Sequence, residues 1–224
     1  MGQLVFIVGK SGMGKSTSLR NLNPDETIIG NSDQKALPFR KFSENYNSEK
    51  GNYFKTSNTG EIISMLRTAH ANPKIKSVII DTWSRILTDF VMDPAFRSEK
   101  GFDKYSRFAA AQYDLINIIN EKLRDDIIVY LFCHPEVHYD EAGFSVERIA
   151  VQGQALAKFV PESFSSIVLY TEIKKVHGQP NHHVFSTKNS GTNSAKSPIG
   201  MFEEDFIDND LIIVEKAIRE YYEL

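Results

Sequence analysis

The sequence is poor in several features that would assign it to other classes of protein. It has one cysteine, Cys133, among 224 residues, so no intramolecular disulfide can form and a reducing compartment, the cytoplasm, is expected. No apolar run reaches the roughly 18 residues that a membrane-spanning helix needs. The chain enters an apolar strand within three residues, so we expect neither a signal peptide nor an N-terminal domain.

The sequence also lacks a strong charge of either sign. Its net charge is −3, so the whole molecule carries no electrostatic footprint of nucleic-acid binding, and any basic surface must be local. Hydrophobic residues make up 41% of the chain, enough for a sizeable core. With no internal repeats or low-complexity tracts, the length predicts one α/β domain over residues 1–224.

What the sequence does contain is the motif G-x-x-x-x-G-K-S, at residues 9–16. It follows the apolar run at residues 4–8 and precedes a segment that can begin a helix. In that setting glycines let backbone N–H groups surround phosphate oxygens, a lysine reaches the β- and γ-phosphates, and a serine hydroxyl ligates Mg²⁺. The motif predicts a nucleotide and Mg²⁺ site. Its residues are Gly9, Gly12, Met13, Gly14, Lys15, Ser16 and Thr17.

Two acids follow short apolar strands. Asp81 ends the strand at residues 77–82, where a second Mg²⁺-organising carboxylate is expected, and we expect that strand to neighbour the one at residues 4–8. Asp33 follows the strand at residues 27–29, where ligands meet the carboxyl ends of strands. Asp33 is either a water-activating carboxylate or a turn aspartate, and the sequence favours neither.

His134 stands at the end of the fully apolar strand at residues 127–133, beside the expected position of Asp81. A polar side chain there can respond to the γ-phosphate and act on the loop that follows, residues 135–152. A structural histidine is the alternative. A zinc site of Cys133, His134 and His138 is disfavoured, because no second cluster completes four ligands.

The remaining pattern predicts helices at residues 61–71 and 109–123, one beginning at residue 153, and a closing helix in residues 203–224. A strand at residues 167–173 should pair with residues 183–187 as an antiparallel hairpin. The fold class is therefore α/β, with a mostly parallel sheet flanked by helices.

Basic and aromatic residues alternate in residues 83–108. That pattern suits a strand of nucleic acid, with phosphates on the cations and bases on the rings. A solvated helix face with aromatics packed inward fits it equally well. The candidate DNA-binding cations are Arg97, Lys100, Lys104 and Arg107.

The order of these parts resembles the RecA-like P-loop ATPase core over residues 4–206. More narrowly, three stretches resemble short phage-encoded RecA-like ATP-binding proteins, some of which are single-strand annealing recombinases. These stretches are Lys35-Ala36-Leu37-Pro38-Phe39, Leu169-Tyr170-Thr171, and the run from Thr187-Lys188-Asn189 to Ala195-Lys196-Ser197-Pro198-Ile199-Gly200-Met201-Phe202.

The resemblance implies hydrolysis of ATP with Mg²⁺, single-stranded DNA as a partner, a ring or filament, and a single-strand-binding protein as a further partner, in the host cytoplasm. Asp33 matches the family's water-activating glutamate with a shorter side chain, which puts the hydrolysis rate in doubt. His134 falls at the γ-phosphate-sensing position, and residues 93–107 and 135–152 at the DNA-contacting loops. Lys188 and Lys196 fall where the family places lysines that reach a neighbouring subunit's ATP; a solvent-facing loop lysine is the alternative for Lys188.

Two other functions stay open from the sequence. A small-molecule or nucleotide kinase uses the same loop, but arginine is sparse after residue 124 and no lid-like cluster is visible. A nucleotide-gated binding module with little hydrolysis is consistent with Asp33 in place of glutamate.

Overall fold

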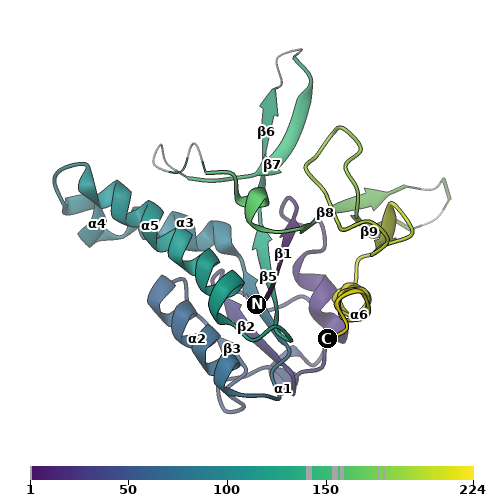
Figure 1. The fold of residues 1–224 in the computed structure, drawn as a ribbon, viewed down its shortest axis with the longest axis horizontal. Helices are drawn as coiled ribbons and strands as arrows, with labels where there is room; N and C mark the ends of the chain where they lie inside the picture. The colour runs from purple at the N-terminus through teal and green to yellow at the C-terminus, as the bar shows by residue number, and fades with distance from the viewer. Residues whose placement is uncertain (1, 140–142, 153–155, 157–158, 176, 179) are drawn as a thin grey trace.

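An eight-stranded sheet crosses the centre of the molecule in the order β10-β9-β8-β1-β5-β4-β2-β3 (Figure 1). The computed structural model describes residues 2–139, 143–152, 156, 159–175, 177–178 and 180–224. Strands β8 to β3 in this order run parallel, whereas β9 and β10 are antiparallel to their neighbours. The strands are β1 (Gln3–Val8), β2 (Thr27–Asn31), β3 (Tyr53–Phe54), β4 (Ser77–Asp81), β5 (Ile128–Cys133), β8 (Ile167–Lys174), β9 (His182–Ser186) and β10 (Phe206–Asp208).

Apolar side chains on both faces explain why β1 and β5 lie in the middle of the sheet. All six residues of β5 are buried. In β1, Phe6 and Val8 pack into the core on one face, and Val5 and Ile7 into the core on the other. A parallel strand covered on both faces is a continuous apolar run, and this is the pattern that the sequence shows.

Helices cover the two faces unequally. The larger layer has α2 (Thr59–Ala71), α3 (Trp83–Met92) and α5 (Asp103–Asn117), which a π-helical stretch, η2 (Ile118–Lys122), continues. The 3₁₀ helix η1 (Ser16–Asn21) and α6 (Leu211–Tyr222) cover the other face. Short elements complete the chain: α1 (Phe42–Asn45), α4 (Pro94–Ser98) and the 3₁₀ helix η4 (Pro161–Phe164).

The fold class predicted from the sequence is confirmed: the chain is α/β, with a large, mostly parallel sheet and the β8–β9 antiparallel hairpin. The predicted neighbour of β1 was wrong. Strand β5 lies between β1 and β4, pairing with both. The all-apolar β5 needs cover on both faces and takes the central place, which separates Asp81 from the phosphate-loop strand by one strand.

The segment after His134 is also more regular than predicted. Residues 135–152 were expected to form a long loop, but β6 (Pro135–Tyr139) and β7 (Ser145–Ile149) pair as an antiparallel hairpin that stands off the main sheet (Figure 1). Gly143 has φ +84° at its turn, a conformation that glycine adopts without steric cost. Much of the expected loop is therefore paired strand.

Two other boundaries differ. Helix α5 begins at Asp103, six residues before the predicted start at residue 109, because Lys104 and Phe108 are both buried and extend the packed face. Residues 40–58 contain the short elements α1 and β3, where the sequence analysis placed no helix or strand. The helix predicted to begin at residue 153 falls largely outside the described residues.

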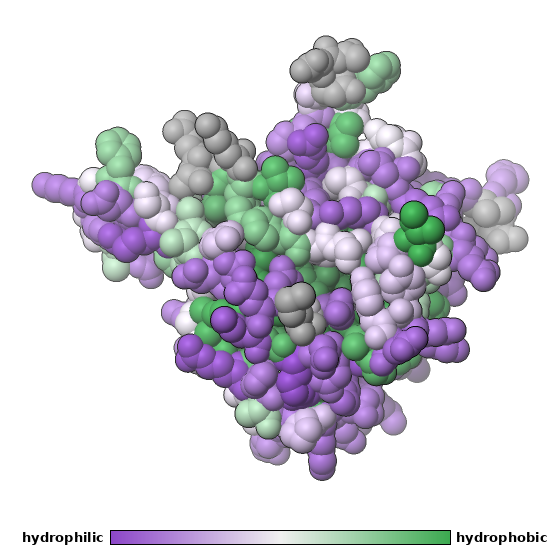
Figure 2. All heavy atoms as spheres, viewed as in Figure 1, coloured by the Kyte–Doolittle hydropathy of each residue, from purple (hydrophilic) through white to green (hydrophobic). Residues whose placement is uncertain are grey.

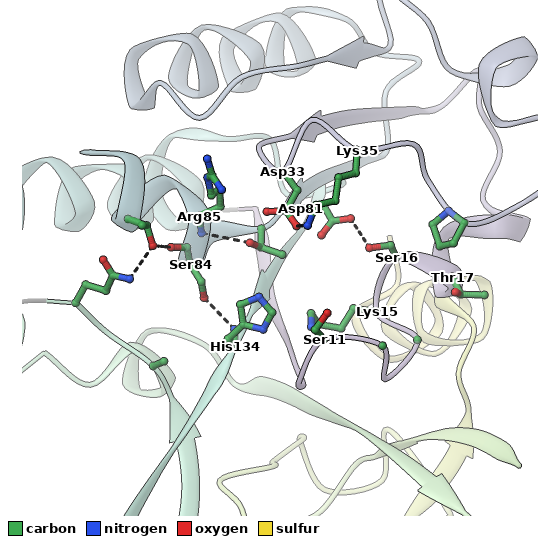
Figure 3. A pocket seen from close by; sticks show the side chains of 17 residues that line it. Ser11, Lys15, Ser16, Thr17, Asp33, Lys35, Asp81, Ser84, Arg85 and His134 are labelled. Atoms are coloured by element: carbon green, nitrogen blue, oxygen red, sulfur yellow. Dashed lines mark hydrogen bonds and ion pairs between the residues drawn. The ribbon is translucent and has the colours of Figure 1, made fainter. Parts of the chain in front are cut away.

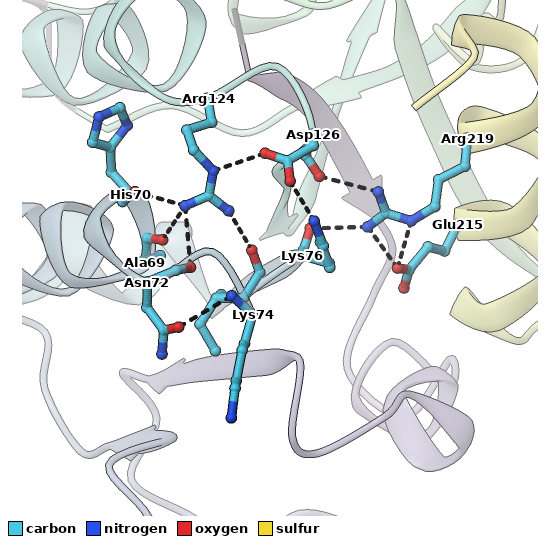
Figure 4. Close-up of polar contacts among 10 residues, drawn as sticks. Ala69, His70, Asn72, Lys74, Lys76, Arg124, Asp126, Glu215 and Arg219 are labelled. Carbon is cyan, nitrogen blue, oxygen red and sulfur yellow. Dashed lines mark hydrogen bonds and ion pairs between the residues drawn. The ribbon is translucent and has the colours of Figure 1, made fainter.

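A cluster of charged side chains joins several elements at the end of the sheet where β5 begins (Figure 4). Arg124 donates to the carbonyls of His70 at 2.6 Å and Ile75 at 2.8 Å, and pairs with Asp126 at 2.9 Å. From α6, Arg219 reaches the Asp126 carbonyl at 3.0 Å. The end of α2, the start of β5 and the C-terminal helix are thereby joined away from the candidate site.

Surface hydrophobic residues are scattered over several segments. In the space-filling view, hydrophilic residues cover most of the lower half, and hydrophobic ones show between the helical layer and the hairpin (Figure 2). The most exposed large apolar side chains, Phe102, Tyr139 and Ile199, come from three separate segments. Within the described residues, no helix is long and apolar enough to cross a membrane.

Candidate nucleotide site

The phosphate loop lies at the carboxyl end of β1 and is held from two sides. The Gly9 N–H donates to the Cys133 carbonyl of β5 at 3.1 Å. On the β8 side, a Cβ at Gly9 would lie 1.8 Å from Thr171 Oγ1, so no larger residue fits. Gly12 and Gly14 have φ of +80° and +96°, values that let the backbone curl as a phosphate cradle requires.

Lys15 is folded into this loop. The residue is buried, and its ammonium donates to the carbonyls of Gly9 and, at 3.1 Å, Lys10. Burial lowers the pKa of Lys15, and the nearby Asp81 carboxylate acts in the opposite direction. The ammonium therefore occupies the interior of the loop, within reach of any anion placed there.

Ser16 and Asp81 meet directly, although they are far apart in sequence. Ser16 Oγ donates to Asp81 Oδ2 at 2.6 Å (Figure 3). Burial raises the pKa of Asp81 to about 6; the Ser16 hydrogen bond opposes the rise, and Asp33 adds to it. A hydroxyl and a carboxylate oxygen side by side are the kind of ligands that Mg²⁺ prefers.

Ser32 fixes the position of Asp81, and the sequence analysis missed it. Its N–H donates to the Asp81 carbonyl at 2.8 Å, and its hydroxyl exchanges hydrogen bonds with the Thr82 N–H at 2.7 Å and carbonyl at 2.6 Å. The signal in the sequence was only a polar residue shortly after an apolar strand. Ser32 thus joins the ends of β2 and β4 beneath the cavity.

Asp33 follows Ser32 and lines the same cavity as the loop. Its carboxylate lies 3.5 Å from the Lys35 ammonium, in a pair whose lysine is largely exposed. The structure therefore brings Asp33 to the site, where its carboxylate can face a water molecule.

His134 lines that cavity too. Its Nδ1 lies 3.2 Å from the Gly9 carbonyl, and its backbone N–H donates to Ser84 Oγ at 2.9 Å. Burial, with Lys15 nearby, lowers the pKa of His134. Because the carbonyl can only accept, Nδ1 carries the proton in the neutral ring and Nε2 is the acceptor.

These residues share one cavity of about 630 Å³ (Figure 3). Beyond Asp81 it extends to Arg85 and Thr88 of α3 and to Gln152, none of which the sequence analysis identified. Gln152 Nε2 donates to Thr88 Oγ1 at 2.7 Å, and Arg85 pairs with Asp89 at 2.7 Å. The cavity therefore extends beyond the phosphate loop as far as α3, where the Arg85 guanidinium is the nearby cation.

The two lysines expected to act on a neighbouring subunit lie outside this cavity. Lys188 pairs with Asp205 at 2.9 Å and donates to the Glu203 carbonyl at 3.1 Å. Lys196 is partly exposed, and its backbone bridges to Val168 of β8. In this chain both lysines belong to the segment after β9.

The four candidate DNA-binding cations differ in availability. Arg97 and Lys100 are exposed, whereas Arg107 pairs with Glu99. Lys104 is buried: it donates to the carbonyls of Phe96 at 3.0 Å and Glu99 at 2.8 Å, with its ammonium 5.2 Å from the centroid of the Phe96 ring. Most of residues 93–107 is helical, in α4 and the start of α5, with a short connection at residues 99–102, and Lys104 holds the two helices together.

The second expected DNA-contacting segment, residues 135–152, has the wrong charge for phosphate. It carries four acids, at positions 136, 140, 141 and 147, and one arginine, Arg148. His138 pairs with Glu136 at 2.8 Å. By sequence, this segment therefore carries mainly negative charge.

A zinc site gains no support. Cys133 is fully buried, and burial raises the pKa of its thiol well above its ordinary value. Across the described part of the chain, no three His, Cys, Asp or Glu side chains converge to hold a metal.

Comparison with known proteins finds a distant structural likeness. No protein-family model matches the chain, and no curated protein sequence matches it. Among solved structures the chain is similar to a KaiC-like protein from the hyperthermophilic archaeon Pyrococcus horikoshii, with a TM-score of 0.49 and 13% identity, covering 92% of this chain and 89% of that one. At that distance the likeness assigns no activity to this chain.

Proposed function

We propose that this chain is a RecA-like P-loop ATPase that binds ATP with Mg²⁺ and hydrolyses it slowly. The Ser16–Asp81 hydrogen bond of 2.6 Å carries the proposal, because it sets a hydroxyl and a buried carboxylate beside the Lys15 ammonium in one cavity. This donor set fits Mg²⁺, which takes oxygen ligands and keeps several waters. Phosphate oxygens and water would complete the coordination.

Each residue then has a separate role. Lys15 exchanges its loop carbonyls for β- and γ-phosphate oxygens, and Ser16 and Asp81 hold the metal, directly or through water. Bound Mg²⁺ supplies neutralisation of the charge on the transferred phosphoryl group. Asp33 orients the attacking water, and its short side chain and its pairing with Lys35 support slow turnover. The charge of a γ-phosphate favours the protonated form of His134, whose backbone N–H contact to Ser84 connects it to α3.

Calorimetric titration with ATP in magnesium buffer tests this proposal. Wild-type protein should bind ATP, Lys15→Ala should abolish binding, and Ser16→Ala should weaken it only when Mg²⁺ is present. Ser11→Ala is the matched control, since it removes a hydroxyl from the same loop without touching Asp81. Absence of uptake of any purine triphosphate by the folded wild type would overturn the proposal.

We further propose that the ATPase acts on single-stranded DNA in recombination or replication, annealing or pairing strands, with a single-strand-binding protein as a further partner. The exposed Arg97 of α4 and Lys100, two residues after that helix, support a DNA contact on that side of the molecule. The acidic β6–β7 hairpin offers phosphates little, so we place the contact at α4 and α5. Anisotropy with a labelled oligonucleotide, with and without ATP and over a salt series, tests it, because phosphate contacts make affinity fall steeply with salt. Unchanged ATP turnover at saturating oligonucleotide would count against it.

We also propose self-association into a ring or filament, with Lys188 and Lys196 reaching the ATP of a neighbouring copy. Their location outside this chain's own cavity and on one segment supports this assignment. Mixing Lys15→Ala protein with Lys188→Ala protein tests it: each alone should be inactive, and mixed oligomers should regain part of the hydrolysis. No recovery in a mixture shown to co-assemble would contradict a role in trans.

Phosphoryl transfer to a small acceptor is a second candidate, and the far end of the cavity favours it. Arg85, Thr88 and Gln152 lie past Asp81, where an anionic acceptor would meet a cation. A panel of nucleoside monophosphates with ATP, scored for transferred phosphate, separates this reaction from hydrolysis.

A further inference from the structure

A second cavity, of about 360 Å³, lies against the same phosphate loop. Gly12, Gly14 and Thr17 line both cavities. The second one faces β9 and the turn between β10 and α6, on the side of β1 away from Asp81. A molecule gripped by the loop can therefore extend into it without crossing the metal ligands.

Asn209 forms part of the wall of this cavity and has an unused donor. Its backbone is fixed: the N–H donates to the His183 carbonyl at 3.1 Å, and the carbonyl accepts from Arg20 at 2.7 Å. The residue is 4% exposed, and among the described residues nothing accepts a hydrogen bond from its buried Nδ2. Buried amide groups are nearly always paired, so this donor points to a ligand.

His183 supplies a hydrogen-bond acceptor to the same cavity. Its Nδ1 lies 3.2 Å from the Met13 carbonyl, so Nδ1 carries the proton in the neutral ring and Nε2 accepts. Both side chains lie against Gly14, through their other polar atoms: a Cβ there would be 3.1 Å from Asn209 Oδ1 and 3.2 Å from His183 Nδ1. The loop and these two side chains are therefore packed as one unit.

The rim of the cavity carries a third polar group. Asp208 Oδ1 lies 2.9 Å from His182 Nε2, and both side chains are mostly exposed. A carboxylate at the rim can accept hydrogen bonds from vicinal hydroxyls, as ribose presents them.

We propose that this second cavity holds the nucleoside of the triphosphate bound at the loop, and that Asn209 and His183 select adenine. The proposal rests on ATP binding at the phosphate loop. Asn209 Nδ2 donates to a ring nitrogen of the base, and His183 Nε2 accepts from the 6-amino group. Guanine and hypoxanthine carry an oxygen at that position, and an oxygen facing the His183 acceptor leaves both groups unpaired.

The test compares calorimetric dissociation constants of ATP, ITP and inorganic tripolyphosphate, each with Mg²⁺. Wild-type protein should prefer ATP to ITP by on the order of tenfold, the effect of one hydrogen bond. Asn209→Ala should weaken the binding of ATP by a similar factor. His183→Asn should abolish the ATP preference, because its amide takes the place of Nδ1 toward Met13 and leaves no acceptor at Nε2. Tripolyphosphate should bind all three proteins equally.

Asn193→Ala is the matched control, since Asn193 is a similarly buried amide, 5% exposed, on the other side of the loop. It should keep the ATP preference. Equal affinity of the wild type for ATP and ITP, or an unchanged ratio in His183→Asn, would overturn the nucleoside site, while retained tripolyphosphate binding would leave the phosphate loop assignment standing. If wild-type protein bound neither ATP nor tripolyphosphate, the underlying proposal would fail instead. The ratio of the ATP and ITP dissociation constants of the wild type tests the proposal even if a variant does not fold.

Discussion

Lys10 Nζ of the phosphate loop lies 2.6 Å from Glu147 Oε1 of strand β7. The backbone of Glu147 is held as well, because its N–H donates to the Thr192 carbonyl at 2.9 Å and its carbonyl accepts from Ser194 at 3.2 Å. The return strand of the β6–β7 hairpin is therefore attached both to the loop and to the segment after β9. A change in the loop when it takes up phosphate has a direct path to the hairpin.

Lys10→Ala should uncouple the hairpin from the nucleotide. The pair is partly exposed, so its loss should change the free energy of unfolding by less than about 1 kcal/mol. Hydrogen exchange of residues 135–139 and 145–149 should respond to ATP in the wild type and much less in the variant. Lys35→Ala serves as control, because Lys35 pairs with Asp33 and not with the hairpin. An equal ATP response in both variants would contradict this path.

Asp81 should make nucleotide binding and stability depend on pH in opposite directions. Its pKa is raised to about 6, mainly by burial. The ligand-free protein should therefore be stabilised by protonation below the ordinary aspartate pKa, and lose that stability as the pH rises through about 6. Metal binding needs the ionised form, so affinity for Mg²⁺ and ATP should fall below pH 6.

Asp81→Asn tests both halves of this prediction. In urea denaturation at pH 8 without nucleotide, the variant should be more stable than the wild type, by up to about 3 kcal/mol. The same variant should bind ATP with Mg²⁺ poorly at every pH. A wild-type free energy of unfolding that does not change between pH 4 and 7, after correction with the variant, would contradict the raised pKa.

Arg124→Ala should destabilise the fold without altering the site. The side chain donates to carbonyls at the end of α2 and pairs with Asp126. Burial acts to raise the pKa of Asp126, but Lys76 and Arg124 outweigh it and hold that pKa below its ordinary value. Losing these contacts should cost about 2–3 kcal/mol, measured by urea denaturation at pH 7.

A matched arginine distinguishes this effect from a change in charge. Arg67→Ala removes an exposed arginine from α2, and its denaturation midpoint should stay close to that of the wild type. Part of the stabilisation from Asp126 should disappear as the pH falls through its lowered pKa, because a protonated carboxyl no longer pairs with Lys76 and Arg124. Equal midpoints for the two variants would show that the cluster contributes little.

Lys104→Met and Lys100→Ala should separate packing from DNA binding. Lys104 is buried and donates to two carbonyls, so its replacement should lower the denaturation midpoint. Lys100 is exposed, so Lys100→Ala should keep the midpoint and reduce the salt dependence of oligonucleotide affinity by about one unit of slope. If Lys100→Ala binds oligonucleotide as the wild type does at every salt concentration, Lys100 makes no phosphate contact.

The sequence predicted best those features that depend on local chemistry. The strands β1, β4 and β5 each bury nearly every residue, so apolar runs marked their places along the chain. The glycine motif needs a strand before it and a helix start after it, and this local context was also visible in the sequence. The expectation that Asp81 and Ser16 would serve one metal site is consistent with their 2.6 Å contact. The structure also brings Asp33 and His134 to the same cavity; their chemical roles stay predictions.

What the sequence could not give depends on partners that are distant along the chain. Ser32 matters because Thr82 lies beside it, and Asn209 because Gly14 does. Lys104 fitted a basic and aromatic pattern typical of nucleic-acid binding, yet the side chain is buried and its ammonium donates to two backbone carbonyls. The position of β5 between β1 and β4 follows from competition among strands for the most covered place, which no single segment reveals.

The anchoring of Gly9 between Cys133 and Thr171 bears on the speed of ligand capture. A cradle whose first residue is fixed by strands on both sides does not have to be assembled around each incoming molecule. The rearrangement on arrival is then the swing of the Lys15 side chain away from two carbonyl oxygens, with no change in the fold of the loop. Encounter, and not folding of the loop, should set the association rate.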